Sequence, residues 1–178
     1  MLDSDRFGDQ TRTVLIHGYR PMLQIRLARV REATSLATMS RELIEQGLGW
    51  SWRPQRMEKA LRDRETNVIV AEKDGRRVGF AAMKYLEETA HLLLFAVQPT
   101  DRRQGVGRAM WQWLSATVET AGIRQVHLEV RARNTDARTF YRQFGFIEAE
   151  TVRGYYRGIE AAIIMRRDFV ETESSRPD

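Results

Sequence analysis

The sequence predicts a mixed β-sheet flanked by helices, a fold of the α/β or α+β class. Two stretches that read as strands, 66–73 and 77–85, are separated by Asp74-Gly75, a pair typical of a tight turn between antiparallel strands. Further along, an apolar strand at 90–97, a helix from 105 to 121 and a strand at 125–131 form a crossover, the connection that parallel strands require. Antiparallel and parallel neighbours together make a mixed sheet with helices packed on it.

The other elements follow from apolar spacing and from end signals. We expect strands at 23–28 and 160–167 and helices at 30–47, 54–63 and 134–145. Gly47 and Gly145 mark helix ends, Pro54 suits a first helical turn, and Asn134 suits an N-cap. The strand at 90–97 carries the unbroken apolar run LLLFAV, so we expect it to be buried on both faces.

The chain is long enough for one domain with a real core, which we place at residues 21–170. The polar segments on either side are expected to be a loosely ordered extension, 1–20, and a flexible tail, 171–178. The longest apolar run is too short to cross a bilayer, and the polar N-terminal segment does not resemble a secretory signal. A cytoplasmic protein is therefore the expectation.

Composition excludes several kinds of site. Cysteine is absent, which excludes a disulfide framework, a thiolate metal site and a cysteine nucleophile. His17, His91 and His127 lie far apart in the sequence, so no metal site is expected. The net charge of +5 permits a nucleic-acid partner, a phosphate-rich ligand or an acidic protein. Because the arginines are spread along the chain, we expect no nucleic-acid partner. Because no apolar run is long enough to span a bilayer, we expect no membrane association.

The segment RRQGVGR, residues 102–108, breaks a local rule at the start of a predicted helix. First helical turns usually favour acidic residues, yet this one is surrounded by arginines. A Gly-Lys-Ser/Thr phosphate loop is absent, and a dinucleotide fingerprint would need a small residue where Met110 stands. The glycine spacing fits a cradle in which backbone N–H groups and the helix dipole hold a pyrophosphate. A helix start eased by glycine, with solvated arginines, is the alternative.

Arg102, Gly105 and Gly107 fill an Arg/Gln-x-x-Gly-x-Gly pattern that resembles the GNAT family of acetyl-CoA-dependent N-acetyltransferases. Within that family, LEVRARNTDARTFYRQFGF followed by VRGYYRGIEAAIIMRR resembles the RimI-like ribosomal-protein alanine N-acetyltransferases. The resemblance implies a mixed sheet of six to seven strands with about four helices, acetyl-CoA as cosubstrate and no metal. It also implies a primary-amine acceptor, foremost a protein N-terminal α-amine. A small-molecule amine, or a catalytically inactive ribosome- or nucleic-acid-binding protein, is the alternative.

The resemblance also implies roles for particular residues. Glu129 would be the general base and Tyr141 the general acid. The residues expected to contact acetyl-CoA are Phe95, Ala96, Val97, Arg102, Arg103, Gln104, Gly105, Val106, Gly107, Arg108, Asn134 and Tyr141. Glu129 could instead be a strand-face carboxylate paired with Arg131, Tyr141 a core aromatic and Asn134 a plain N-cap.

Acceptor recognition is less constrained by the sequence. Trp50, Trp52, Tyr155 and Tyr156 are candidates for contact with the acceptor, and simple packing explains them equally well. The segment LGWSWRP has no counterpart in the RimI-like pattern. Either a monomer or a homodimer is compatible with the sequence.

Overall fold

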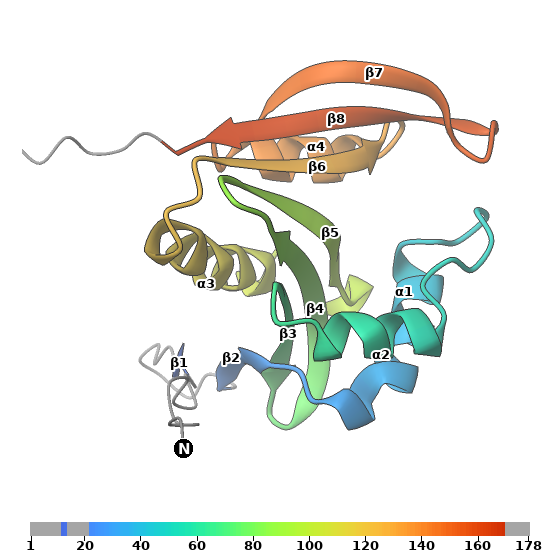
Figure 1. Cartoon of the computed structure of the whole chain (residues 1–178). Coiled ribbons are helices and arrows are strands. Elements are labelled where there is room, and N and C mark those ends of the chain that lie inside the picture. The colour runs from blue at the N-terminus through green and yellow to red at the C-terminus, as the bar shows by residue number, and fades with distance from the viewer. Residues whose placement is uncertain (1–11, 14–21, 170–178) are drawn as a thin grey trace, which may run out of the picture. The chain divides into compact units, whose positions relative to one another are not determined.

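The computed structural model describes residues 12–13 and 22–169 (Figure 1). The helices are η1 (Val30–Glu32), α1 (Ala33–Leu43), α2 (Pro54–Arg62), η2 (Pro99–Asp101), α3 (Val106–Thr120) and α4 (Thr135–Arg142). The strands are β1 (Arg12–Thr13), β2 (Leu23–Leu27), β3 (Thr66–Lys73), β4 (Arg76–Tyr85), β5 (Thr89–Val97), β6 (Gln125–Arg131), β7 (Ile147–Tyr156) and β8 (Glu160–Asp168). Apart from Arg12–Thr13, the segments predicted to be loosely ordered, 1–20 and 171–178, lie outside the described residues.

The strands follow the order β1-β2-β3-β4-β5-β6-β8-β7. The pairing of β5 with β6 is parallel, whereas β2 with β3 and β6 with β8 are antiparallel, so the sheet is mixed as predicted. Without the two-residue β1, the described residues form seven strands and four α-helices, which confirms the predicted numbers. Contacts divide the chain into two compact units, 1–82 with 94–114 and 83–93 with 115–178, and each is described by itself below. The single domain at 21–170 stays a prediction.

In the first unit, β2 pairs with β3, and β3 turns into β4 at Asp74 and Gly75. Both turn residues have positive φ, 52° and 76°, as the predicted tight hairpin requires. Helix α2 packs against α1 and β3. At Gly79 of β4 a Cβ would come within 2.7 Å of Met110 Sδ and 2.9 Å of the Ala96 carbonyl oxygen. The absence of a side chain at Gly79 therefore permits the close packing of α3 and β5 there.

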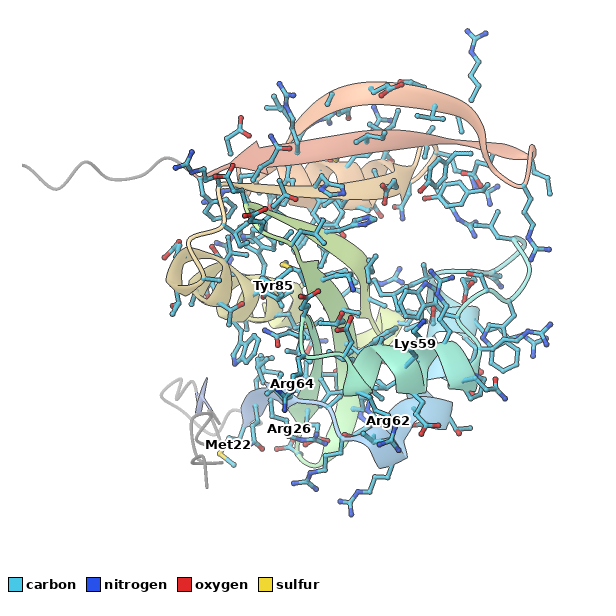
Figure 2. The ribbon with its side chains drawn as sticks, viewed as in Figure 1. Met22, Arg26, Lys59, Arg62, Arg64 and Tyr85 are labelled. Carbon is cyan, nitrogen blue, oxygen red and sulfur yellow. The ribbon has the colours of Figure 1, made fainter. Side chains whose placement is uncertain are left out.

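An ion-pair network connects β2 to η1, β3 and β4 in this unit. Arg26, labelled in Figure 2, donates to Glu72 of β3 and to Glu32 of η1. Arg77 of β4 reaches the same Glu32 carboxylate. The hydrogen bond from Arg26 is the main reason why the pKa of Glu32 lies at about 2, despite the opposing effect of burial. The network places an ionised carboxylate among strands that are far apart in the sequence.

In the second unit, β6 lies between β5 and β8, and β7 is the edge strand beyond β8. The parallel ladder between β5 and β6 pairs Thr89 with Gln125 and ends where His91 faces His127. The strand β7 was not predicted from the sequence. Its residues are mostly exposed, and its pairing with β8 is irregular, so it lacks the alternation by which a half-buried strand is identified.

Two predictions about elements need correction. The helix expected at 30–47 begins with the 3₁₀ turn η1, and α1 already ends at Leu43, before a turn region containing Gly47. The strand β5 is not buried on both faces, because buried residues alternate with half-buried ones along it. Its half-buried positions include Leu93, Phe95 and Val97. Side-chain hydrophobicity reports what a residue prefers, whereas burial also requires a layer of structure to cover it.

Candidate active site

The predicted phosphate-binding loop connects η2 to α3 in the first unit. Its backbone is left-handed at Arg103 and Gly105, with φ values of 59° and 84°. A Cβ at Gly105 would meet no atom within 4 Å, so this position favours glycine for its backbone conformation and not for lack of space. Helix α3 begins at Val106, and the N–H groups of its first turn have no partner within the helix. The loop thus ends in a set of backbone donors suited to an anion.

Side chains around this loop fix its position. Arg102 donates from Nε to the Val97 carbonyl at 3.1 Å. Gln104 accepts from Lys73 Nζ at 2.7 Å and donates to the Thr100 carbonyl at 2.8 Å. Arg102, Arg103, Gln104, Gly105 and Arg108 are exposed. A negatively charged ligand can therefore approach the loop without displacing the core, and the residues present fit a pyrophosphate.

Asp101 is a residue that the sequence interpretation missed. Its carboxylate is buried and accepts two hydrogen bonds from Arg76, at 2.9 and 3.0 Å. The hydrogen bonds from Arg76 hold the pKa of Asp101 below its ordinary value, against the effect of burial. This ion pair ties the start of the loop to β4. Asp101 stands beside the arginine-rich segment in the sequence, but nothing local indicates that Arg76 is its partner.

Glu129 lies on β6 in the second unit, with its side chain 18% exposed. His91 Nε2 lies 2.6 Å from Glu129 Oε2, within hydrogen-bonding distance. The His91 ring stacks on His127, with centroids 4.3 Å apart and planes at 22°. His91 and His127, which lie far apart in the sequence, are thus direct neighbours in the structure. Arg131, the alternative partner considered for Glu129, forms an ion pair with Glu160 at 3.7 Å.

Burial and the histidines act in opposite directions on the Glu129 carboxylate. Burial would raise the pKa of Glu129, but the hydrogen bond and charge of His91, with a contribution from His127, leave it below its ordinary value. Burial is also the main cause of the lowered pKa of His127, reinforced by the charge of His91. Glu129 is therefore an ionised carboxylate near neutral pH, ready to accept a proton or to bind a cation.

Tyr155 and Tyr156 lie on β7 and contact each other edge to face, with ring centroids 5.0 Å apart. Burial and the negative charge of Glu129 raise the pKa of Tyr155. Burial, Tyr155 and Glu129 raise the pKa of Tyr156 to about 12. Both phenols are thus close enough to Glu129 to respond to its charge. Their contact with an acceptor stays a prediction.

Tyr141 is on α4, with 7% of its surface exposed, and its ring meets Phe146 edge to face at 5.6 Å. Burial raises the pKa of its phenol, so the hydroxyl stays protonated near neutral pH. The Tyr141 ring is therefore part of the core. Its hydroxyl is protonated, which is the form that a general acid needs in order to donate a proton.

Asn134 caps the same helix by accepting a hydrogen bond from the Ala137 N–H at 3.1 Å. The N-cap role of Asn134 is confirmed, and its role toward the cofactor stays a prediction.

The two tryptophans belong to the connection between α1 and α2, which is organised by a buried carboxylate. Glu45 is 7% exposed and accepts hydrogen bonds from the backbone N–H groups of Ser51 and Trp52, at 2.7 and 3.2 Å. The hydroxyls of Ser40 and Ser51 also donate to it. Trp50 donates from Nε1 to the carbonyls of Ala37 and Trp52. These contacts give the Trp50 indole and the Trp52 backbone a part in shaping the connection, and Glu45 was not singled out from the sequence.

Among the described residues, no helix combines the length and the apolar composition needed to cross a membrane.

Comparison with known proteins identifies the family. A family model described as an acetyltransferase (GNAT) domain matches residues 35–167. The ribosomal protein bS18-alanine N-acetyltransferase of Escherichia coli (strain K12) is 40% identical over 95 residues, which are 52% of this chain and 64% of that protein. The chain therefore matches less than two thirds of the length of this relative. An N-alpha-acetyltransferase of Sulfurisphaera tokodaii is 34% identical over 118 residues, which are 59% of this chain and 71% of the relative.

Structural similarity extends further along the chain. The crystal structure of the ribosomal-protein-S18-alanine N-acetyltransferase from Escherichia coli superposes with a TM-score of 0.75 and 26% identity, covering 88% of this chain and 100% of that one. The match reaches well beyond the glycine loop and Glu129 to the other elements of the fold. With a family model that covers most of its length, the chain belongs to the GNAT family of acetyltransferases.

Proposed function

We propose that this chain is a RimI-like enzyme that transfers the acetyl group of acetyl-CoA to the α-amine at the N-terminus of a protein. The observation that carries the proposal is the ionised, half-buried Glu129, whose carboxylate contacts His91. In the same chain, the glycine loop ends at the N-terminus of α3, where backbone N–H groups can bind an anion. Acetyl-CoA supplies an acetyl group activated as a thioester. We further propose that the enzyme acts in the cytoplasm.

Binding of the cosubstrate is assigned to the loop and to β5. The backbone N–H groups of residues 102–108 would hold the pyrophosphate, and the surrounding arginines would balance its charge. A backbone N–H among Phe95, Ala96 and Val97 would donate to the thioester oxygen as negative charge develops there. Asn134 would hold the pantetheine arm. The exposed loop and the half-buried face of β5 support these assignments.

Proton transfer is assigned to two side chains. The acceptor arrives as an ammonium and must lose a proton before its nitrogen can attack. Glu129 would take that proton directly or through one water, and His91 holds its carboxylate in position. As the new C–N bond forms and the C–S bond breaks, Tyr141 would protonate the departing sulfur, for which its phenol must remain protonated beforehand. The nitrogen loses its second proton as the amide forms, and that proton would return to the Tyr141 phenolate through solvent. Direct transfer needs no nucleophile on the enzyme, in keeping with a sequence that lacks cysteine.

The acceptor class is inferred from the two relatives whose names specify an N-terminal or alanine amine. Tyr155 and Tyr156, whose phenols are close enough to Glu129 to respond to its charge, would contact the acceptor backbone. Trp50 and Trp52 would act indirectly, by shaping the connection between α1 and α2.

A peptide panel tests this proposal. One peptide carries a free N-terminal alanine and no lysine, and its matched control has a blocked N-terminus and one internal lysine. We expect acetylation, followed by mass spectrometry, only of the first. Polyamines and single amino acids form a third arm, because a small-molecule acceptor is the alternative. Reaction confined to lysine or to small amines would refute the N-terminal assignment while leaving acetyl transfer intact.

A further inference from the structure

The cluster formed by His91, His127 and Glu129 has the composition of a metal site. Each residue offers one ligand atom, and the three atoms lie within 4.8 Å of one another. Apart from the contacts within the cluster, the described residues provide neither imidazole with another hydrogen-bond partner. Both histidines therefore retain nitrogen atoms that can bind a cation.

The backbone holds these three side chains in fixed positions. His91 and His127 face each other across the parallel pair of β5 and β6. Glu129 follows His127 by two residues on the same strand, so it points to the same face of the sheet. The side chains of His91 and Glu129 are 26% and 18% exposed, which leaves a path for an ion from solvent. A site built on strands needs little backbone ordering when it binds.

The donor set selects a class of cation. Two imidazole nitrogens and one carboxylate oxygen suit zinc and similar transition metals, whereas magnesium and calcium prefer oxygen ligands alone. With metal–ligand bonds of about 2.0–2.2 Å, ligand atoms around one tetrahedral ion lie roughly 3.3–3.6 Å apart. His91 Nε2 and Glu129 Oε2 are 2.6 Å apart, so they need to separate by about 0.7–1 Å. Side-chain rotation can supply that movement, and water can complete the coordination.

We propose that His91, His127 and Glu129 form a binding site for a zinc-class divalent cation, and that the bound ion inhibits acetyl transfer by occupying the Glu129 carboxylate. The ion takes the place of the proton that Glu129 would otherwise accept, so it acts as a reversible inhibitor and has no part in the chemistry. Only the inhibitory effect rests on the proposed function. Binding of the ion can be measured without any acceptor.

The first experiment measures binding. Protein without a histidine tag is stripped of metal and titrated calorimetrically with zinc sulfate, with magnesium sulfate as the hard-cation control. We expect one zinc ion per chain, and an affinity that falls at least tenfold in His127→Gln and in Glu129→Ala. His17→Gln is the matched control, because it removes the one histidine outside the cluster and should leave the affinity unchanged. Absence of saturable binding, or loss of binding in His17→Gln alone, overturns the site.

A second measurement uses the wild-type protein, so its result does not depend on whether the binding-site variants fold. In the wild type, cobalt ions added below stoichiometry should broaden the imidazole proton NMR signals of two histidines and spare the third. Assignment through His17→Gln identifies the spared signal. Broadening of the His17 signal, with the other two unaffected, also overturns the site.

The inhibition experiment separates this inference from the proposed function. Initial rates of peptide acetylation are taken by mass spectrometry, because the thiol product itself binds zinc. Saturating zinc should lower the wild-type rate at least tenfold, and a chelator should restore it. His127→Gln, normalised to its own metal-free rate, should require at least tenfold more zinc. If the protein binds zinc but never acetylates a peptide, the proposed function is refuted and the cation site stands. If the enzyme acetylates peptides at the same rate with and without zinc, the proposed inhibition is refuted.

Discussion

Replacing Glu45 should destabilise the connection between α1 and α2 more than any change of an exposed acid. The carboxylate is buried and accepts hydrogen bonds from the Ser51 and Trp52 N–H groups and from the Ser40 and Ser51 hydroxyls. In Glu45→Ala these donors lose their acceptor, at about 1–3 kcal/mol for each one that stays buried. Partial access of water to the exposed Ser51 lowers the sum, so we expect a loss of about 2–4 kcal/mol in the free energy of unfolding. In a chain of this size that corresponds to roughly 5–15 °C in Tm.

Glu45→Gln should lose less, about 1–2 kcal/mol, because one amide oxygen can still accept from Ser51 while the amide nitrogen opposes the remaining donors. The assay is urea denaturation followed by tryptophan fluorescence, to which Trp50 and Trp52 contribute, with thermal melting alongside. Glu42→Ala is the matched control, since Glu42 is exposed on the neighbouring helix α1. If Glu45→Ala unfolds within 0.5 kcal/mol of Glu42→Ala, the carboxylate does not organise this connection.

The remaining predictions concern catalysis, cofactor binding and acid stability. Glu129→Gln and Tyr141→Phe should each lower turnover by about 10²- to 10⁴-fold, with Glu129→Gln retaining calorimetric affinity for acetyl-CoA; wild-type rates in both would refute the acid–base assignment. Gly107→Phe should abolish acetyl-CoA binding in calorimetry while circular dichroism stays unchanged, and retained affinity would contradict the loop assignment. The pKa of Glu32 lies at about 2, below its ordinary 4.5, so its stabilising contribution is present above about pH 4.5 and is lost as the pH falls toward 2. The free energy of unfolding should therefore fall by on the order of 2 kcal/mol more over that range in the wild type than in Glu32→Gln, and parallel curves would show that the Arg26 network is not responsible.

Features set by neighbouring residues were predictable from the sequence. The bounds of β3 and β6 agree with the prediction to the residue, as does the turn at Asp74 and Gly75. Asn134 caps α4 as expected, and the glycine loop opens α3. In each case the signal lies within a few positions of the sequence. It is a capping residue, a residue pair that tolerates positive φ, or a regular pattern of apolar residues. Edge strand β7 escaped prediction because exposed side chains on an irregular strand leave no such pattern.

Features set by partners distant in the sequence were not predictable. In the sequence, Glu45 resembles any acidic residue near a helix end. Its role depends on the Ser51 and Trp52 N–H groups, which belong to a loop whose conformation the sequence does not specify. The same is true of Asp101, whose partner Arg76 lies 25 residues away. Both carboxylates are buried, yet in sequence they resemble residues that solvate a surface. Burial of a charge depends on where its counter-charge or its donors arrive, and that is decided by tertiary structure.

The surroundings of Glu129 show most clearly what limits a sequence-based account. Because side chains alternate along a strand, His127 and Glu129 share one face of β6, and both lie close to His91. Placing His91 beside them requires the register between β5 and β6, which are parallel and joined through α3, so no tight turn fixes it. A shift of one residue would send the His91 side chain to the opposite face of the sheet. The carboxylate could therefore be proposed as a base from its own segment, whereas the histidine that holds it, and the cation that the three side chains can bind, emerge only once the two strands are paired.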